Sequence, residues 1–315
     1  MDFYKQIFKR KSFHIFKNIE VITDDELGRL NDFFKAAKPL NAEIKTEIHI
    51  VPEEQTTCKR GGQYCILFYS ETKEEYLRNI GYIGEQIDLY LASQNIGALW
   101  FGIGKPKDMQ INGLDFVIMI SIAKIPEDKF RKDMFKSKRK PLCEIWNGDT
   151  LGVAEIARFA PSACNTQPWF TENNGSDLMI YRYKKPGKRG IMPIDKVMYY
   201  NRIDMGIFLF MLETCLEHEN YTYERSLFED ISDHSIEQTL IARYTYRSNQ
   251  ANSNSVRFNN PTSPFCRTSF RCNKAIGEHM EAGTARKFQF GTPELIKSFK
   301  NMDKEFYLVL QSEKQ

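Results

Sequence analysis

The segment 159–170, FAPSACNTQPWF, carries side chains that suit recognition of a polar ring. Ser162, Asn165 and Gln167 bring hydroxyl and amide groups, and an amide both donates and accepts hydrogen bonds along the edge of a heteroaromatic molecule. Pro161 ends the helix expected before it, because a proline ring cannot continue a helix. The alternative for this segment is an ordinary capped loop between two elements.

A second polar segment, 8–16, reads FKRKSFHIF. Arg10, Lys11, Ser12 and His14 stand here between apolar residues. Cations beside a hydroxyl suit a phosphate group through charge-assisted hydrogen bonds. The same composition is also typical of a solvated basic turn.

The third segment, 135–142 or FKSKRKPL, closes a stretch with seven cations from Lys129 to Lys140. Lys138 and Arg139 are its candidate anion ligands, and the alternatives are a solvated charge run or a nonspecific anion patch. A nucleic-acid-binding module is a further hypothesis for this run together with the basic tail. We expect no nucleic-acid partner, because the chain has no nucleic-acid motif and its aromatic residues do not alternate regularly with the cations.

The fourth segment, 95–104 or NIGALWFGIG, is rich in glycine. Gly97, Gly102 and Gly104 let a backbone come close to a ligand, and the alternative is a plain helix-to-strand turn. The segment has neither a GxGxxG register nor a P-loop, so neither nucleotide motif is predicted.

Hydrophobic spacing predicts the elements that position these segments. We expect helices at about residues 25–37, 76–91, 150–159 and 203–216, and strands at about 43–51, 65–69, 116–122, 178–183 and 240–246. Such a mixture indicates an α+β fold. Each half has a helix, a strand, a long helix with an Ile-Asp pair (Ile87-Asp88, Ile203-Asp204) and a final strand, which indicates duplication.

The composition is that of an ordinary globular protein: 315 residues, 42% hydrophobic, 27% charged and a net charge of +3. The apolar stretch 207–212 is far shorter than the roughly 20 residues that span a bilayer, and the N-terminus has no signal-peptide core. The seven cysteines are scattered and form no CxxC pair, which indicates reduced thiols and no metal site. We therefore expect a cytoplasmic protein without a membrane partner.

The tail, residues 249–315, holds ten Lys or Arg and six Asp or Glu. The positive net charge of the chain therefore comes from the tail. Residues 248–269 are rich in Asn, Ser, Pro and Thr, which favours a partly disordered linker. Residues 293–311 could form one helix, capped by Thr292. The predicted boundary lies near Ser248.

Together the four segments resemble the FMN-dependent nitroreductase superfamily. That family opens with Arg-Arg-Ser-x-Arg-x-Phe, similar to residues 10–16 here, although His14 stands where the family has arginine. Its loop, Ala-Pro-Ser-x-x-Asn-x-Gln-Pro-Trp, is matched at every defined position from Ala160 to Trp169. The cations before Pro141 also resemble the family's phosphate-contacting segment. The resemblance covers about residues 1–248.

The spacing of the motifs departs from ordinary members of that family. The loop follows the opening segment by about 150 residues, counted from Ser12 to Ser162, instead of a few dozen, and residues 33–40 lack it. This resembles the TM nitroreductase subgroup, whose chain fuses two nitroreductase-like halves into a pseudo-dimer with antiparallel-containing sheets flanked by helices. The implied divisions are residues 1–143, residues 144–248 and the tail, with one complete site between the halves.

The resemblance also implies roles for single residues. FMN phosphate and ribityl would be held by Arg10, Lys11, Ser12, Lys138 and Arg139, with the part of His14 left open. The other half would contact the ring or ribityl through Pro161, Ser162, Asn165 and Gln167. Backbone at Gly102 and Ile103 would lie near the reactive flavin nitrogen.

The implied activity is that of an FMN-dependent oxidoreductase. NADH or NADPH would deliver a hydride, and a small electron-poor acceptor such as a nitroaromatic or quinone would then be reduced in a ping-pong scheme. No side chain is predicted to act as a catalytic acid or base, because the cofactor carries the chemistry. The alternative is a protein that binds or handles flavin without turnover. The protein would be a monomer or a weak homo-oligomer.

Overall fold

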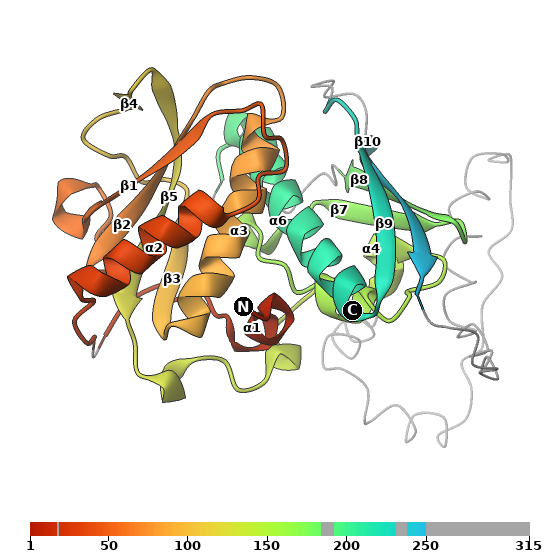
Figure 1. The fold of residues 1–315 in the computed structure, drawn as a ribbon, viewed down its shortest axis with the longest axis horizontal. Coiled ribbons are helices and arrows are strands. Elements are labelled where there is room, and N and C mark those ends of the chain that lie inside the picture. The colour runs from red at the N-terminus through yellow and green to blue at the C-terminus, as the bar shows by residue number, and fades with distance from the viewer. Residues whose placement is uncertain (18, 184–191, 231–237, 250–315) are drawn as a thin grey trace, which may run out of the picture. The chain divides into compact units, whose positions relative to one another are not determined.

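The computed structural model describes residues 1–17, 19–183, 192–230 and 238–249, and these belong to one unit that runs from Met1 to Ser255 (Figure 1). The linker and the helix predicted for residues 250–311 lie outside the described residues. Across the described chain, no helix has the length and apolar character needed to cross a membrane.

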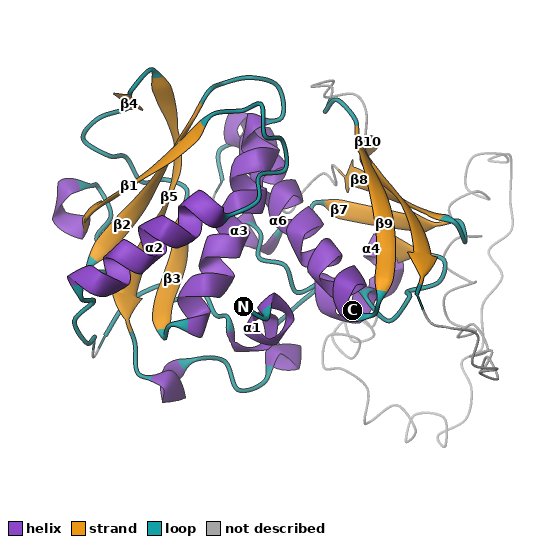
Figure 2. Cartoon of the chain, in the orientation of Figure 1, coloured by secondary structure: helices purple, strands orange, loops and turns teal. Residues whose placement is uncertain are grey.

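The first half builds an antiparallel sheet of order β1-β2-β5-β3, with β4 added on β5 (Figures 1 and 2). Its elements are α1 (Phe3–Lys9), α2 (Asp24–Ala36), β1 (Thr46–Pro52), β2 (Tyr64–Ser70), α3 (Tyr76–Ser93), β3 (Ile96–Phe101), β4 (Gln110–Ile111) and β5 (Leu114–Lys124). A capping box fixes the start of α2, because Thr23 and Glu26 satisfy each other's backbone N–H groups.

The second half builds a sheet of order β6-β7-β8-β10-β9, in which β6 is parallel to β7 and the other pairs are antiparallel. Its elements are α4 (Leu142–Ile145), β6 (Trp146–Asn147), α5 (Ala154–Ala157), β7 (Trp169–Asn173), β8 (Asp177–Tyr183), α6 (Val197–His218), β9 (Tyr221–Leu227) and β10 (Gln238–Ser248). The α+β class with antiparallel-containing sheets and flanking helices is confirmed.

The two halves repeat one topology. Apart from the two-residue strands β4 and β6, each has two paired strands, a long helix and two more strands, and in each sheet the fourth of these strands lies between the second and the third. The long helices α3 and α6 pack on each other inside the core (Figure 2). Their closest approach is reciprocal: a Cβ on Gly81 would overlap the carbonyl of Ile203, and a Cβ on Gly206 would overlap that of Arg78.

The register of this repeat is 125 residues, since Gly81 corresponds to Gly206. Directly after the two helices, Asn95 (φ 57°) and Asn220 (φ 59°) take the same left-handed conformation at the same spacing. Ile87-Asp88 and Ile203-Asp204 do not occupy corresponding places in this register. The Ile-Asp pattern therefore indicated duplication but aligned the halves wrongly.

Two other expectations from the sequence are corrected. The helix predicted at 150–159 shrinks to α5, because Leu151 and Gly152 have positive φ angles and hold the chain out of a helix until Ala154. Most of the glycine segment 95–104 is strand β3, where Gly97 makes room for the Phe13 ring and not for a ligand.

Candidate cofactor site

Arg10 ends α1 and is buried, with only 3% of its surface exposed. Its Nε donates to Oδ2 of Asp88 at 2.7 Å, and its Nη2 donates to Oγ of Ser12 at 3.0 Å. Burial opposes the charge of Arg10, but Asp88 and Glu85 raise its pKa overall. Trp100 donates to the same Asp88 oxygen at 2.9 Å, so the Arg10–Ser12 segment is fixed against α3 and β3.

Arg139 lies within electrostatic range of three other arginines, Arg10, Arg131 and Arg158, and Arg131 lies within range of Arg10. Burial and the other three cations lower the pKa of Arg139 to about 10, and burial and Arg10 lower the pKa of Arg131 to about 10. The Nε atoms of Arg139 and Arg158 are buried and have no hydrogen-bond partner among the described residues. We call these four residues the arginine cluster; its charge exceeds that of the acids beside it, so it favours an anion.

The loop 161–167 meets the basic run directly. Nη1 of Arg139 donates to Oδ1 of Asn165 at 3.1 Å, and Nδ2 of Asn165 donates to the carbonyl of Lys138 at 3.2 Å. The backbone N–H of Lys140 donates to Oε1 of Gln167 at 2.9 Å. The structure thus brings the phosphate segment predicted in the first half onto the amide loop predicted in the second.

The loop keeps an unusual backbone. Cys164, Asn165 and Gln167 have φ angles of 50°, 56° and 47°, a region that costs a residue other than glycine on the order of 1 kcal/mol or more. Ser162 stabilises this shape by accepting a hydrogen bond from the N–H of Gln167 at 3.0 Å. On α6, Oδ1 of Asp204 accepts the N–H of Ala163 at 2.9 Å. The loop is therefore held in place before any ligand is considered.

Gly102 contacts Tyr200, which in turn lies near Cys164 of the loop. The Tyr200 hydroxyl donates to the carbonyl of Gly102 at 2.7 Å, and a Cβ on Gly102 would come 2.6 Å from the Tyr200 ring. Burial, and then Cys164 in the loop, raise the pKa of Tyr200. Gly102 is needed here to let Tyr200 pack on the backbone.

Three predicted residues lie at the surface outside this hydrogen-bonded network, whereas Lys138 and Asn165 are exposed but belong to it. Ile103 is 62% exposed, His14 is exposed beyond the buried Phe13, and Lys11 is exposed with its Nζ donating to the carbonyl of Lys129 at 3.1 Å. Pro161, by contrast, is buried at the start of the loop. The hydrogen-bonded part of the site consists of Arg10, Ser12, Lys138, Arg139, Ser162, Asn165 and Gln167.

Sequence reasoning missed five residues of this site: Asp88, Arg131, Arg158, Tyr200 and Asp204. Arg131 was visible only as one of seven cations in the run 129–140. Asp88 and Asp204 were visible only as members of the Ile-Asp pairs. Arg158 and Tyr200 have no sequence signal, because their roles depend on which parts of the two halves face each other.

Comparison with known proteins shows the family of the chain. The profile of the family described as "Putative TM nitroreductase" matches residues 2–215. The chain belongs to this nitroreductase family. No curated protein matches.

Solved structures of nitroreductases are similar to the chain at low sequence identity. One from Thermotoga maritima MSB8 is 18% identical, with a TM-score of 0.48, and the match covers 78% of this chain and 93% of that one. One in complex with FMN from Desulfovibrio desulfuricans is 16% identical, with a TM-score of 0.36, covering 46% and 94%. One with bound FMN from Desulfitobacterium hafniense DCB-2 is 15% identical, with a TM-score of 0.32, covering 45% and 99%.

Within this nitroreductase chain, the repeat defines a second place that corresponds to the site. There Glu213 takes the position of Asp88, and Phe210 that of Glu85. A cavity of about 190 Å³ lies beside them, lined by Phe3, Phe33, Ala36, Ala37, Lys38, Tyr82, Gln86, Phe210, Glu213, Thr214 and Glu217. Its lining contains two acids, several aromatic rings and a single lysine but no arginine, so it suits a phosphate less than the arginine cluster does.

Glu213 is fully engaged at this second place. It accepts hydrogen bonds from Tyr82 at 2.6 Å, Tyr244 at 2.6 Å, Tyr223 at 3.1 Å and Arg225 at 2.7 Å. Arg225 also donates to the carbonyl of Leu40 at 3.1 Å. Leu40 precedes Asn41, whose N–H bonds to Asn79 of α3, as Ser162 precedes Ala163, whose N–H bonds to Asp204 of α6, so Leu40 takes the place of Ser162 by this contact.

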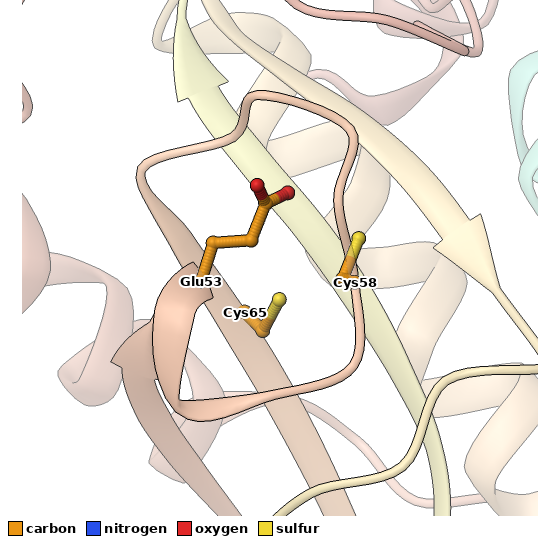
Figure 3. A group of neighbouring side chains, drawn as sticks. All are labelled: Glu53, Cys58 and Cys65. Atoms are coloured by element: carbon orange, nitrogen blue, oxygen red, sulfur yellow. The ribbon is translucent and has the colours of Figure 1, made fainter.

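A separate group of reactive side chains lies after β1, where Glu53, Cys58 and Cys65 place one ligand atom each within 4.8 Å of the others (Figure 3). The Glu53 carboxylate already accepts the N–H groups of residues 60, 61 and 62 and the hydroxyl of Ser121. Burial raises the pKa of Cys58 to about 12 and also raises that of Cys65, so both thiols keep their protons. We interpret the role of this group as structural: it stabilises the loop between β1 and β2.

Proposed function

We propose that the chain is an FMN-dependent NAD(P)H oxidoreductase that reduces small electron-poor acceptors such as nitroaromatics or quinones. One observation carries the proposal: the arginine cluster lies against the loop that holds Ser162, Asn165 and Gln167. Both halves would thereby supply ligands for one molecule, arginines for an anion and amides for a polar ring or chain. Family membership supports the same function.

The donor set fits the phosphate of FMN. Burial and Arg10 lower the pKa of Arg131, and burial and three arginines lower that of Arg139, so a bound dianion would relieve the repulsion between these cations. The buried Nε atoms of Arg139 and Arg158 are donors in need of an acceptor. Arg10, which is buried and bonded to Asp88, would add positive electrostatic potential at the phosphate.

The loop fits the more neutral part of the cofactor. Side-chain amides and a hydroxyl at residues 162–167 would bind the ribityl chain or the ring edge, and the rigid backbone of the loop would orient it. When bound, FMN supplies the two-electron chemistry, and the chain binds, orients and shields it. We name no catalytic acid or base, and donor and acceptor would use the site in turn.

The repeat supports a pseudo-dimer that is complete within one chain. The contact of α3 with α6 at Gly81 and Gly206 is internal, so the chain needs no second copy to unite the halves. We expect a monomer, which sedimentation equilibrium of the full chain would measure.

Activity is tested by anaerobic titration of the FMN-loaded protein with NADH and with NADPH. Bleaching of the flavin absorbance, followed by its return when a quinone or nitroaromatic is added, is the expected result. Parallel double-reciprocal plots would show that donor and acceptor alternate.

A second candidate is a protein that binds or handles flavin without turnover. One observation favours it: the first half has already lost the loop serine, with Leu40 in that place. Flavin that binds tightly but is not bleached by either nicotinamide nucleotide would support this candidate against the enzyme.

A further inference from the structure

Asp204 of α6 has a buried carboxyl that touches the cofactor loop. Its Oδ1 accepts the backbone N–H of Ala163 at 2.9 Å, and the residue is 3% exposed. Its Oδ2 is also buried and has no hydrogen-bond partner among the described residues. The Thr166 hydroxyl lies close enough to lower the pKa of Asp204, although its oxygen makes no hydrogen bond of ordinary geometry among the described residues. One of the two carboxyl oxygens of Asp204 therefore makes no regular hydrogen bond to the described residues.

No cation of the described chain is paired with Asp204. Two cations contact the loop itself, and they bond to other atoms of it: Arg139 to Oδ1 of Asn165 and Lys140 to the carbonyl of Gln167. The charged or titratable side chains on the neighbouring elements also have other partners: Arg182 and Arg202 bond to Asp230, Arg78 to the carbonyls of Phe228 and Ile241, and Arg158 to the carbonyl of Lys140. Tyr200, near Cys164, bonds to the carbonyl of Gly102. A buried carboxyl without a cation favours its neutral form. Burial accordingly raises the pKa of Asp204 to about 8.

The repeat supplies an internal comparison. Asn79, 125 residues earlier on α3, accepts the N–H of Asn41 at 3.1 Å, just as Asp204 accepts that of Ala163. A neutral amide therefore makes the same helix-to-loop bond in the half whose loop lacks the serine, asparagine and glutamine of the cofactor loop. Only the half with the cofactor loop has an ionisable residue at this position.

We propose that Asp204 is a positioning residue that, as a neutral acid, holds the loop 161–167 in its cofactor-binding form, and that its ionisation releases the loop. The identity of the cofactor rests on the proposed function. The direction of the pH dependence follows from the thermodynamic linkage between proton binding and folding. A carboxyl with a raised pKa in the folded protein stabilises fully below the ordinary aspartate pKa of about 4, and this stabilisation is lost as pH rises toward the folded value.

The first test is the rate of FMN release from the reconstituted full chain between pH 6 and pH 9, measured by the recovery of flavin fluorescence. We compare the wild type with Asp204→Asn, which keeps the acceptor oxygen but cannot ionise. The expected result is that the wild-type rate rises at least about tenfold relative to the variant over this range. Because titration of the FMN phosphate is common to both proteins, it cancels in the ratio.

Two further variants separate positioning from general stability. Asp204→Ala removes the acceptor and should release FMN quickly at every pH. Asn79→Ala removes the corresponding bond in the other half, and should lower the unfolding midpoint without changing FMN release. Identical pH profiles for the wild type and Asp204→Asn would overturn the proposal.

The second test needs no flavin. In flavin-free protein, the urea midpoint of the wild type should fall relative to that of Asp204→Asn as pH rises from 5 to 8. A constant difference would overturn the role of Asp204 even in a protein that binds no FMN. If the urea midpoints change with pH as predicted but the protein does not bind FMN, only the proposed function is rejected.

Discussion

Nη1 of Arg139 lies 3.1 Å from Oδ1 of Asn165, and this hydrogen bond joins the basic run to the polar loop. The same guanidinium donates through Nη2 to the carbonyl of Phe159 at 3.1 Å. Its Nε stays buried without a partner among the described residues. Arg139 is thus fixed by the loop and still has a donor to offer an anion.

Replacing Arg139 with alanine should weaken FMN binding by about tenfold to a hundredfold, the effect of losing a hydrogen bond to a charged group. Fluorescence quenching of FMN measures the dissociation constant. Arg139→Lys should lose less, because it keeps the charge without the planar donors. The exposed Arg29, paired with Asp25 on α2, offers a matched control, and Arg29→Ala should leave the constant unchanged.

Flavin affinity should also fall at high pH. The pKa values of Arg131 and Arg139 are lowered to about 10, and a phosphate binds only their cationic forms. Affinity should therefore hold below about pH 10 and decline as pH rises through it, which equilibrium dialysis can follow. Arg131→Lys combined with Arg139→Lys should alter that decline. A pH profile unaffected by these substitutions would argue against arginine as the anion ligand.

One chain should bind one FMN. The place that corresponds to the site by the repeat has Glu213 and Glu217 beside its cavity, and Leu40 in the position of Ser162. Acids repel a phosphate, and Glu213 is already saturated by its four donors. Flavin released by denaturation, divided by protein from amino-acid analysis, measures the ratio. A ratio of two would show that the second place also binds the cofactor.

The crossing of α3 and α6 should tolerate no added methyl group. Gly81→Ala or Gly206→Ala would force a Cβ into a facing carbonyl, so each should lower the free energy of unfolding by about 1–3 kcal/mol or more. Gly28→Ala in α2 is the control, because nothing lies within 4 Å of its added Cβ and alanine favours a helix. Urea denaturation compares the three variants, and equal stability of all three would contradict this packing.

The sequence was most informative where a local pattern decides the structure. The stripe of Tyr76, Ile80, Ile83, Ile87 and Leu91 predicted α3, since one apolar face fixes a helix. The loop motif also identified the family, because Pro161 and the amides after it define a local shape. Strand β3 was missed because the glycines in and after it resemble a turn, although Gly97 makes room for the side chains of Ile125 and Phe13.

The site as a whole was only partly predictable. Arg131 and Arg158 are 27 residues apart in the chain, and only the meeting of the two halves brings them into one cluster with Arg10. Asp88 looked like part of a repeated Ile-Asp pattern, but the fold matches it with Glu213. Long-range pairing of this kind leaves no periodic signal in one sequence.

The visible absorption spectrum of the purified full chain, before and after incubation with FMN and gel filtration, tests the central claim most directly. The account predicts a yellow protein with the bands of an oxidised flavin, and loss of that colour when Arg10→Ala and Arg139→Ala are combined. A folded wild-type protein that stays colourless after incubation with FMN would contradict it.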